Sequence, residues 1–91
     1  MKTTMIVLFA HWCPKCNMMM PIVDEVENEF SEKLKVQRID VEQEPEMMEI
    51  YEVQIVPTFV VLKGETEIGR MAGLIGEEMF KERLTEILKR Q

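Results

Sequence analysis

The sequence has no long apolar segment and only two cysteines among its 91 residues. A transmembrane helix requires about 20 predominantly apolar residues, and no stretch approaches that length. A secretory signal peptide requires an apolar core of at least ~7 residues and a small-residue cleavage site, whereas the apolar run near the N-terminus, Met5–Phe9, is shorter. We therefore expect a cytoplasmic protein without a membrane segment.

Positive charge is also scarce. Lys and Arg number 11 against 17 Asp and Glu, which gives a formal net charge of −6. Such a chain repels the phosphates of nucleic acids and an anionic membrane surface, so neither is an expected partner. The length suits one domain spanning residues 1–91 with a single hydrophobic core, and we expect it to act as a monomer.

The two cysteines are separated by two residues, in Cys13-Pro14-Lys15-Cys16. A stable structural disulfide is rare in the cytoplasm, where a close cysteine pair is more often catalytic or metal-binding. The pair follows the apolar run Met5–Phe9 and precedes a helical pattern. A Cys-x-x-Cys motif near a strand–helix–strand unit is typical of a redox site.

Hydrophobic periodicity predicts an α/β chain. The expected strands cover 5–9, 34–41, 58–62 and 66–71, and the expected helices cover 14–30, 42–52 and 77–90. The first strand is continuously apolar, which favours a central position covered on both faces. The second alternates imperfectly, which favours a sheet edge. The first strand, helix and second strand are expected to form a right-handed crossover.

The start of the first helix is where the chemistry is expected. Pro14 suits the first helical position because its missing N–H is harmless there. The unpaired N–H groups of the first turn favour a thiolate at Cys13, and Lys15 adds a positive charge. Such a pair can attack a disulfide through Cys13, form a mixed disulfide and resolve it with Cys16.

Several other interpretations stay open at this point. A structural zinc site usually has four ligands, and only Cys13, Cys16 and His11 cluster, so no metal site is predicted. The cysteines could instead be two unrelated buried thiols, and a Cu(I) site with methionine ligands is a weaker alternative. His11 is expected to face solvent rather than carry protons. Trp12 is either a rim aromatic or a platform for a protein substrate.

Two motifs together resemble the thioredoxin superfamily. They are Trp12–Cys16 and Ile55–Thr58, and the resemblance extends from about Thr4 to the C-terminus. The residues Phe9–Cys13 are similar to the segment that leads into the active site of thioredoxins. Pro21 matches the proline that kinks the active-site helix, and Gly73 a glycine of the substrate groove. The resemblance implies a minimal thioredoxin fold, with a four-stranded mixed sheet of order 2-1-3-4 and helices on both faces.

The resemblance also implies roles for individual residues. Cys13 is expected to attack and Cys16 to resolve, with Pro14 and Lys15 supporting them. The Val56–Pro57 bond is expected to be cis, and Val56 to offer its backbone to an extended substrate. The substrate-binding residues are then Trp12, Val56, Pro57 and Gly73. The implied activity is reduction of protein disulfides, with no bound cofactor and with electrons from NADPH through a flavin-containing reductase.

Some features depart from the usual thioredoxin pattern. The leading strand and helix are missing, and Val7 and Arg38 occupy the positions of a buried aspartate and its lysine partner. Cys13-Pro14 and the short length favour a glutathione-dependent glutaredoxin instead. The Val-Pro-Thr order at 56–58 and the lack of an acidic patch at 72–75 favour protein disulfides. A non-catalytic binding or metal-carrier module is the third alternative.

Overall fold

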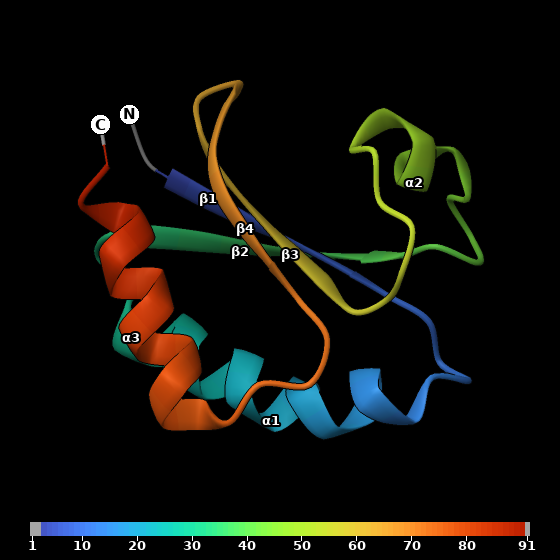
Figure 1. Ribbon diagram of the computed structural model, residues 1–91, viewed down its shortest axis with the longest axis horizontal. Coiled ribbons are helices and arrows are strands. Elements are labelled where there is room, and N and C mark those ends of the chain that lie inside the picture. Colours follow the sequence, from blue (N-terminus) through green and yellow to red (C-terminus); the bar gives the residue numbers. More distant parts are fainter. Residues whose placement is uncertain (1–2, 91) are drawn as a thin grey trace.

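A computed structural model describes residues 3–90; residues 1, 2 and 91 of the predicted domain lie outside the described part. Seven elements follow one another along the chain: β1 (Thr3–Phe9), α1 (Pro14–Glu29), β2 (Leu34–Asp40), α2 (Glu46–Ile50), β3 (Thr58–Lys63), β4 (Thr66–Ala72) and α3 (Glu77–Leu88) (Figure 1). Each predicted strand and helix is present. None of the helices in residues 3–90 is long and apolar enough to cross a membrane.

The four strands form one mixed sheet in the order β2-β1-β3-β4. β1 runs parallel to β2 and antiparallel to β3, and β4 is antiparallel to β3. Helices α1 and α3 cover one face of the sheet, and α2 lies over the other (Figure 1). This arrangement confirms the predicted fold class, including the strand order and the edge position of β2.

β1 contributes to the core on both sides of the sheet. Met5 and Val7 pack in the cluster that also contains the inner faces of α1 and α3. Ile6 and Leu8 pack in the opposite cluster, against which the α2 side chains Met47 and Met48 lie. All four β1 side chains are buried. The continuous apolar run of β1 therefore reflects a central strand with no solvent-facing side.

One end of the sheet gathers three connecting segments. Leu8, near the end of β1, pairs with Thr58 at the start of β3, and Thr58 pairs with Ala72 at the end of β4. The segments 10–13, 53–57 and 73–75 therefore leave the sheet at the same end. This is the end at which α1 begins, so the cysteine motif lies beside two loops distant in the sequence.

The prediction for α2 was wrong in its extent. The chain forms a turn over 41–43, and the Gln43 and Glu44 N–H groups bond to the Asp40 carbonyl. The Glu42 N–H donates to the Asp40 carboxylate at 2.9 Å, so the acidic run forms a turn closed by Asp40, and the helix spans only Glu46–Ile50. α3 likewise ends at Leu88 rather than at Arg90. The other boundaries differ by one or two residues, as helix and strand ends commonly do.

Candidate active site

Cys13 is the N-cap of α1, and Pro14 follows it at the first helical position. The Cys13 Sγ accepts the backbone N–H of Cys16 at 3.1 Å. An N-cap side chain normally satisfies one of the unpaired N–H groups of the first turn, and serine, threonine or aspartate usually does so. Here a sulfur takes that place, so the positive end of the helix is directed at the Cys13 thiol.

The loop before α1 is held by short-range hydrogen bonds. The Cys13 N–H donates to the Ala10 carbonyl at 3.2 Å, and the Asn17 N–H donates to the Cys13 carbonyl at 3.1 Å. The Asn17 side-chain amide donates to the His11 carbonyl at 3.3 Å. These bonds fix the approach of the chain to α1 and thereby the position of the Cys13 sulfur.

The two cysteines differ in their access to the surface, and burial affects the thiol of Cys16. Cys13 is 4% exposed and Cys16 is fully buried. Burial, together with a side-chain hydrogen bond to Cys13, raises the pKa of the Cys16 thiol to about 11. Cys16 is therefore a protonated thiol near neutral pH. Of the two, only Cys13 retains contact with the surface, which fits an attacking role for Cys13 and a resolving role for Cys16.

The proline loop lies against Cys13. The Cys13 Sγ is 3.7 Å from the Val56 carbonyl oxygen, to which its S–H is directed. The Val56–Pro57 peptide bond is cis. The Gly73 N–H donates to the Pro57 carbonyl at 2.9 Å, and Gly73 has a left-handed φ of 83° that glycine adopts without strain. Cys13, Val56, Pro57 and Gly73 are thus brought together from three segments.

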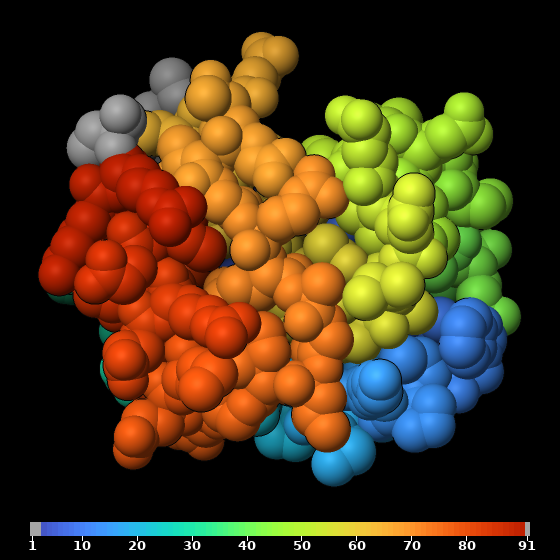
Figure 2. Space-filling model, viewed as in Figure 1, coloured from blue at the N-terminus to red at the C-terminus, as the bar shows by residue number. Residues whose placement is uncertain are grey.

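Exposed apolar side chains surround this meeting point. Trp12 is 66% exposed, and Ile55 and Leu74 are also exposed. Each is adjacent in sequence to one of the joined residues, and the three segments meet on one face of the molecule (Figure 2). Met18, on α1 near the cysteines, is exposed as well. The sequence pointed to Trp12 as a rim aromatic or a substrate platform, but did not single out Ile55 or Leu74.

A thiol at a helix N-terminus, a buried second thiol one turn below it and a facing proline loop are features of a known fold family. The thioredoxin family model matches residues 1–86. The chain belongs to the thioredoxin family. This confirms the resemblance that the two sequence motifs indicated.

Two similar proteins show how this thioredoxin-family chain compares in length. It is 30% identical over 88 residues to thioredoxin Y1, chloroplastic, of Arabidopsis thaliana. The aligned region covers 97% of this chain and 51% of that protein. It is 28% identical over 87 residues to the bifunctional thioredoxin reductase/thioredoxin of Mycobacterium leprae, covering 96% of this chain and 19% of that protein. The chain therefore spans about half of the first and about a fifth of the second.

A solved structure supports the same fold. The crystal structure of the germline-specific thioredoxin Deadhead from Drosophila melanogaster superimposes with a TM-score of 0.86 at 29% sequence identity. The match covers 93% of this chain and 80% of that one. The four-stranded sheet and its helices are therefore a thioredoxin fold.

Val7 and Arg38 were predicted from the sequence to replace a buried aspartate and its lysine partner. Val7 is fully buried and cannot exchange a proton. Arg38 pairs with Val7 across β1 and β2, and its guanidinium binds the α1 carboxylates of Asp24 at 2.6 Å and Glu27 at 3.0 Å. Arg38 therefore joins β2 to α1. Cys13 is the titratable side chain whose hydrogen bond and charge raise the pKa of Cys16.

His11 and Lys15 both lie at the surface of this thioredoxin-like site. The His11 Nε2 is 3.2 Å from the Asp40 carboxylate, and its side chain is 74% exposed, in agreement with the predicted solvent-facing position. Lys15 is exposed on the first turn of α1. Asp40, which also closes the turn before α2, was not identified from the sequence because its role depends on β2 ending beside the α1 entry loop.

Within residues 3–90, no group of three or more His, Cys, Asp or Glu side chains is arranged to hold a metal ion. His11, the third member of the cluster considered from the sequence, is directed to Asp40 instead.

Proposed function

We propose that this chain is a thiol–disulfide oxidoreductase that reduces protein disulfides through Cys13 and Cys16. The observation that carries the proposal is the position of the Cys13 Sγ. It lies 3.1 Å from the Cys16 N–H at the start of α1 and 3.7 Å from the Val56 carbonyl. The sulfur is thus placed between a helix N-terminus that stabilises a thiolate and a backbone that can bind an extended chain.

The reaction proceeds in two exchanges. The Cys13 thiolate attacks one sulfur of the substrate disulfide, which forms a mixed disulfide and releases the other sulfur as a thiolate. Cys16 then loses its proton and attacks the Cys13 sulfur. The products are the Cys13–Cys16 disulfide and a substrate dithiol. Two electrons pass from the enzyme to the substrate, and the released substrate thiolates take up two protons.

The substrate binds across the surface around Cys13. Val56 offers its backbone to an extended segment, and Trp12, Pro57 and Gly73 form the remaining contacts. Pro14 occupies the start of α1, and Lys15 places an exposed positive charge on the same turn. Ile55 and Leu74 extend the apolar rim, which suits a protein segment better than a small hydrophilic thiol.

A flavin-containing reductase that uses NADPH is proposed to restore the dithiol. The Mycobacterium leprae relative, named as a bifunctional thioredoxin reductase/thioredoxin, supports a partner of this kind. We further propose that the chain acts as a monomer in the cytoplasm, where a catalytic cysteine pair is more common than a structural disulfide. Its charge of −6 supports protein partners rather than nucleic acids or membranes.

Insulin reduction with dithiothreitol tests the proposal. Wild-type protein should accelerate the reaction, and Cys13→Ser should show only the uncatalysed rate. Cys16→Ser should form a mixed disulfide with the substrate that persists, since the resolving thiol is absent, and mass spectrometry should place the adduct on Cys13. A wild-type rate no higher than that of Cys13→Ser would end the proposal. Turnover supported by glutathione but by no NADPH-dependent thioredoxin reductase would indicate the glutaredoxin alternative.

A further inference from the structure

The segment between α2 and β3 carries the Val56 carbonyl that faces Cys13. Its β3 end is fixed by the Thr58 hydroxyl, which donates to the Ile55 carbonyl at 2.7 Å, and by the Gly73–Pro57 bond. Its α2 end contains Glu52, which adopts a left-handed φ of 53°. A non-glycine residue in this region is unfavourable by about 1 kcal/mol or more. Such a conformation persists only where surrounding contacts hold it.

Backbone bonds close the left-handed turn, from the Glu52 N–H to the Glu49 carbonyl at 3.1 Å and from the Val53 N–H to the Met48 carbonyl at 2.7 Å. Arg70 on β4 adds side-chain contacts at the same point. Its guanidinium donates to the Tyr51 carbonyl at 2.8 Å and to the Glu52 carbonyl at 3.1 Å. These carbonyls follow the last turn of α2, where carbonyl groups lack helical partners and where an arginine can bind them. α2 itself has no basic residue in its last turn, so the binding charge comes from a strand 18 residues further along the chain.

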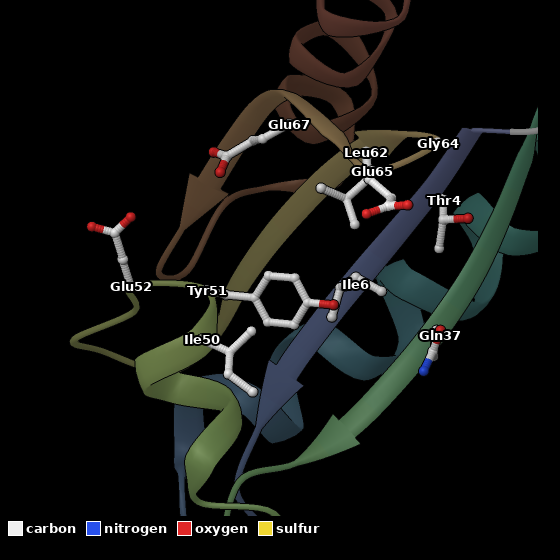
Figure 3. A pocket seen from close by; sticks show the side chains of 10 residues that line it. All are labelled: Thr4, Ile6, Gln37, Ile50, Tyr51, Glu52, Leu62, Gly64, Glu65 and Glu67. Atoms are coloured by element: carbon white, nitrogen blue, oxygen red, sulfur yellow. The ribbon is translucent and has the colours of Figure 1, made fainter.

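Glu67 orients the Arg70 guanidinium. Its two carboxylate oxygens accept hydrogen bonds from Arg70 at 2.6 and 2.8 Å. This bidentate geometry fixes the plane of the guanidinium as well as its position. Figure 3 shows Glu67 on β4 facing Tyr51 and Glu52 at the end of α2, on the two sides of a hollow over the sheet.

A β-bulge makes this pairing possible. Side chains three positions apart on a regular strand point to opposite faces of the sheet. In β4, however, Glu67 pairs with Leu62 and Gly69 pairs with Val61, so Ile68 is an extra residue. The extra residue shifts the alternation and places Glu67 and Arg70 on the same face, the one over which α2 lies.

We propose that Arg70, oriented by Glu67 across the β4 bulge, is a positioning residue that sets the distance between the proline loop and Cys13 and thereby the affinity for protein substrates. The inference rests on the proposed function, because it assigns Val56 to substrate binding. Three residues separate Glu52 from Val56, so a displacement of the bound carbonyls is transmitted along a short segment. Arg70 touches neither cysteine and is not expected to change their chemistry.

Two disulfide substrates distinguish this role from a general loss of structure. Insulin binds along the loop, whereas the small aromatic disulfide 5,5′-dithiobis(2-nitrobenzoate) reaches Cys13 without it. Arg70→Ala should lower kcat/KM for insulin about tenfold, chiefly through KM, and change the rate with the small disulfide by less than about twofold. Arg70→Lys, which lacks the planar fork, should be intermediate.

Arg38→Ala is the matched control. Arg38 is 31% exposed and Arg70 is 35% exposed, and each binds carboxylates, but Arg38 contacts α1 and not the proline loop. Arg38→Ala should leave both rates unchanged. Equal losses with both disulfides, or an unchanged KM for insulin in Arg70→Ala, would contradict the inference.

A readout independent of catalysis separates this inference from the proposed function. In the reduced protein, amide hydrogen exchange at Glu52 and Val53, whose N–H groups bond to carbonyls of α2, should become faster in Arg70→Ala and stay at the wild-type rate in Arg38→Ala, while exchange in β1 is unchanged in both. If Arg70→Ala does not fold, Glu67→Gln serves instead, since it weakens the bidentate bond and keeps the guanidinium. Unchanged exchange at Glu52 and Val53 would contradict the inference even if the wild-type protein reduces insulin.

Discussion

Cys16 occupies an environment that favours its protonated form. It is fully buried beneath Cys13, and burial is the largest cause of its raised pKa. Val7 is expected to stand at the position where thioredoxins bury an aspartate, and its side chain cannot accept the Cys16 proton. In the proposed mechanism, a group other than Val7 takes the Cys16 proton during resolution.

The stability of the reduced protein should consequently fall with pH in an alkaline window. The folded state keeps the Cys16 proton up to about pH 11, whereas the unfolded chain loses it near 9. The free energy of unfolding contributed by Cys16 is thus fully present below pH 9 and is lost as the pH rises to about 11. Urea denaturation of reduced wild type and Cys16→Ala should show a stability difference that shrinks by roughly 2 kcal/mol across this window. A constant difference would contradict the raised pKa.

The residues of the site were predictable to different degrees. The cysteine pair was visible as a motif, and the resemblance pointed to Val56, Pro57 and Gly73, which the structure places together. Arg70 and Glu67 left no such signal, since three-residue spacing on a strand normally separates side chains and only the bulge unites them. The sequence also could not show that Asp40 would meet His11.

The bulge in β4 also affects how α3 packs on the sheet. Gly69 faces α3, and a Cβ atom at this position would lie 2.8 Å from the Cγ1 and Cγ2 atoms of Ile87. Ile87 is buried and belongs to the core under α3. A glycine is therefore required here by the close approach of the helix to the strand, and not by its backbone conformation.

Gly69→Ala should destabilise the protein by about 1–3 kcal/mol, because the added methyl group forces Ile87 and α3 away from β4. Gly76→Ala is the control, since a Cβ atom there meets no atom within 4 Å. Chemical denaturation of the two variants measures the difference. Equal stability of both variants would contradict the packing, and partial recovery in Gly69→Ala combined with Ile87→Val would support it.

Elements with strong periodicity were predicted well, and those shaped by local side-chain bonds were not. β1 and α1 carry long apolar patterns that reflect the core directly, and their positions agree with the prediction. α2 has no buried residue and so produces no comparable pattern. Its start was placed too early because the acidic run before it appeared suited to a helix N-terminus. The bonds to Asp40 instead hold that run in a turn.

The fold places Cys13 and Cys16 together at one end of a small sheet. The Cα radius of gyration is 12.2 Å, which matches a compact domain of this length. The charge of −6 is carried largely by exposed carboxylates, while the exposed side chains next to Cys13 and the proline loop include Trp12, Ile55 and Leu74. At this scale the proposed function assigns this partly apolar surface, which also carries the charge of Lys15, to protein partners.

Redox titration of the wild-type protein against glutathione, read by mass spectrometry after trapping of free thiols, tests the dithiol assignment most directly. We expect one transition in which both cysteines escape trapping together, so that the reduced protein carries two labels and the oxidised protein none, with the slope of a two-electron couple. Separate glutathione adducts on Cys13 and Cys16, or a Cys16 thiol that stays free while Cys13 is oxidised, would contradict it.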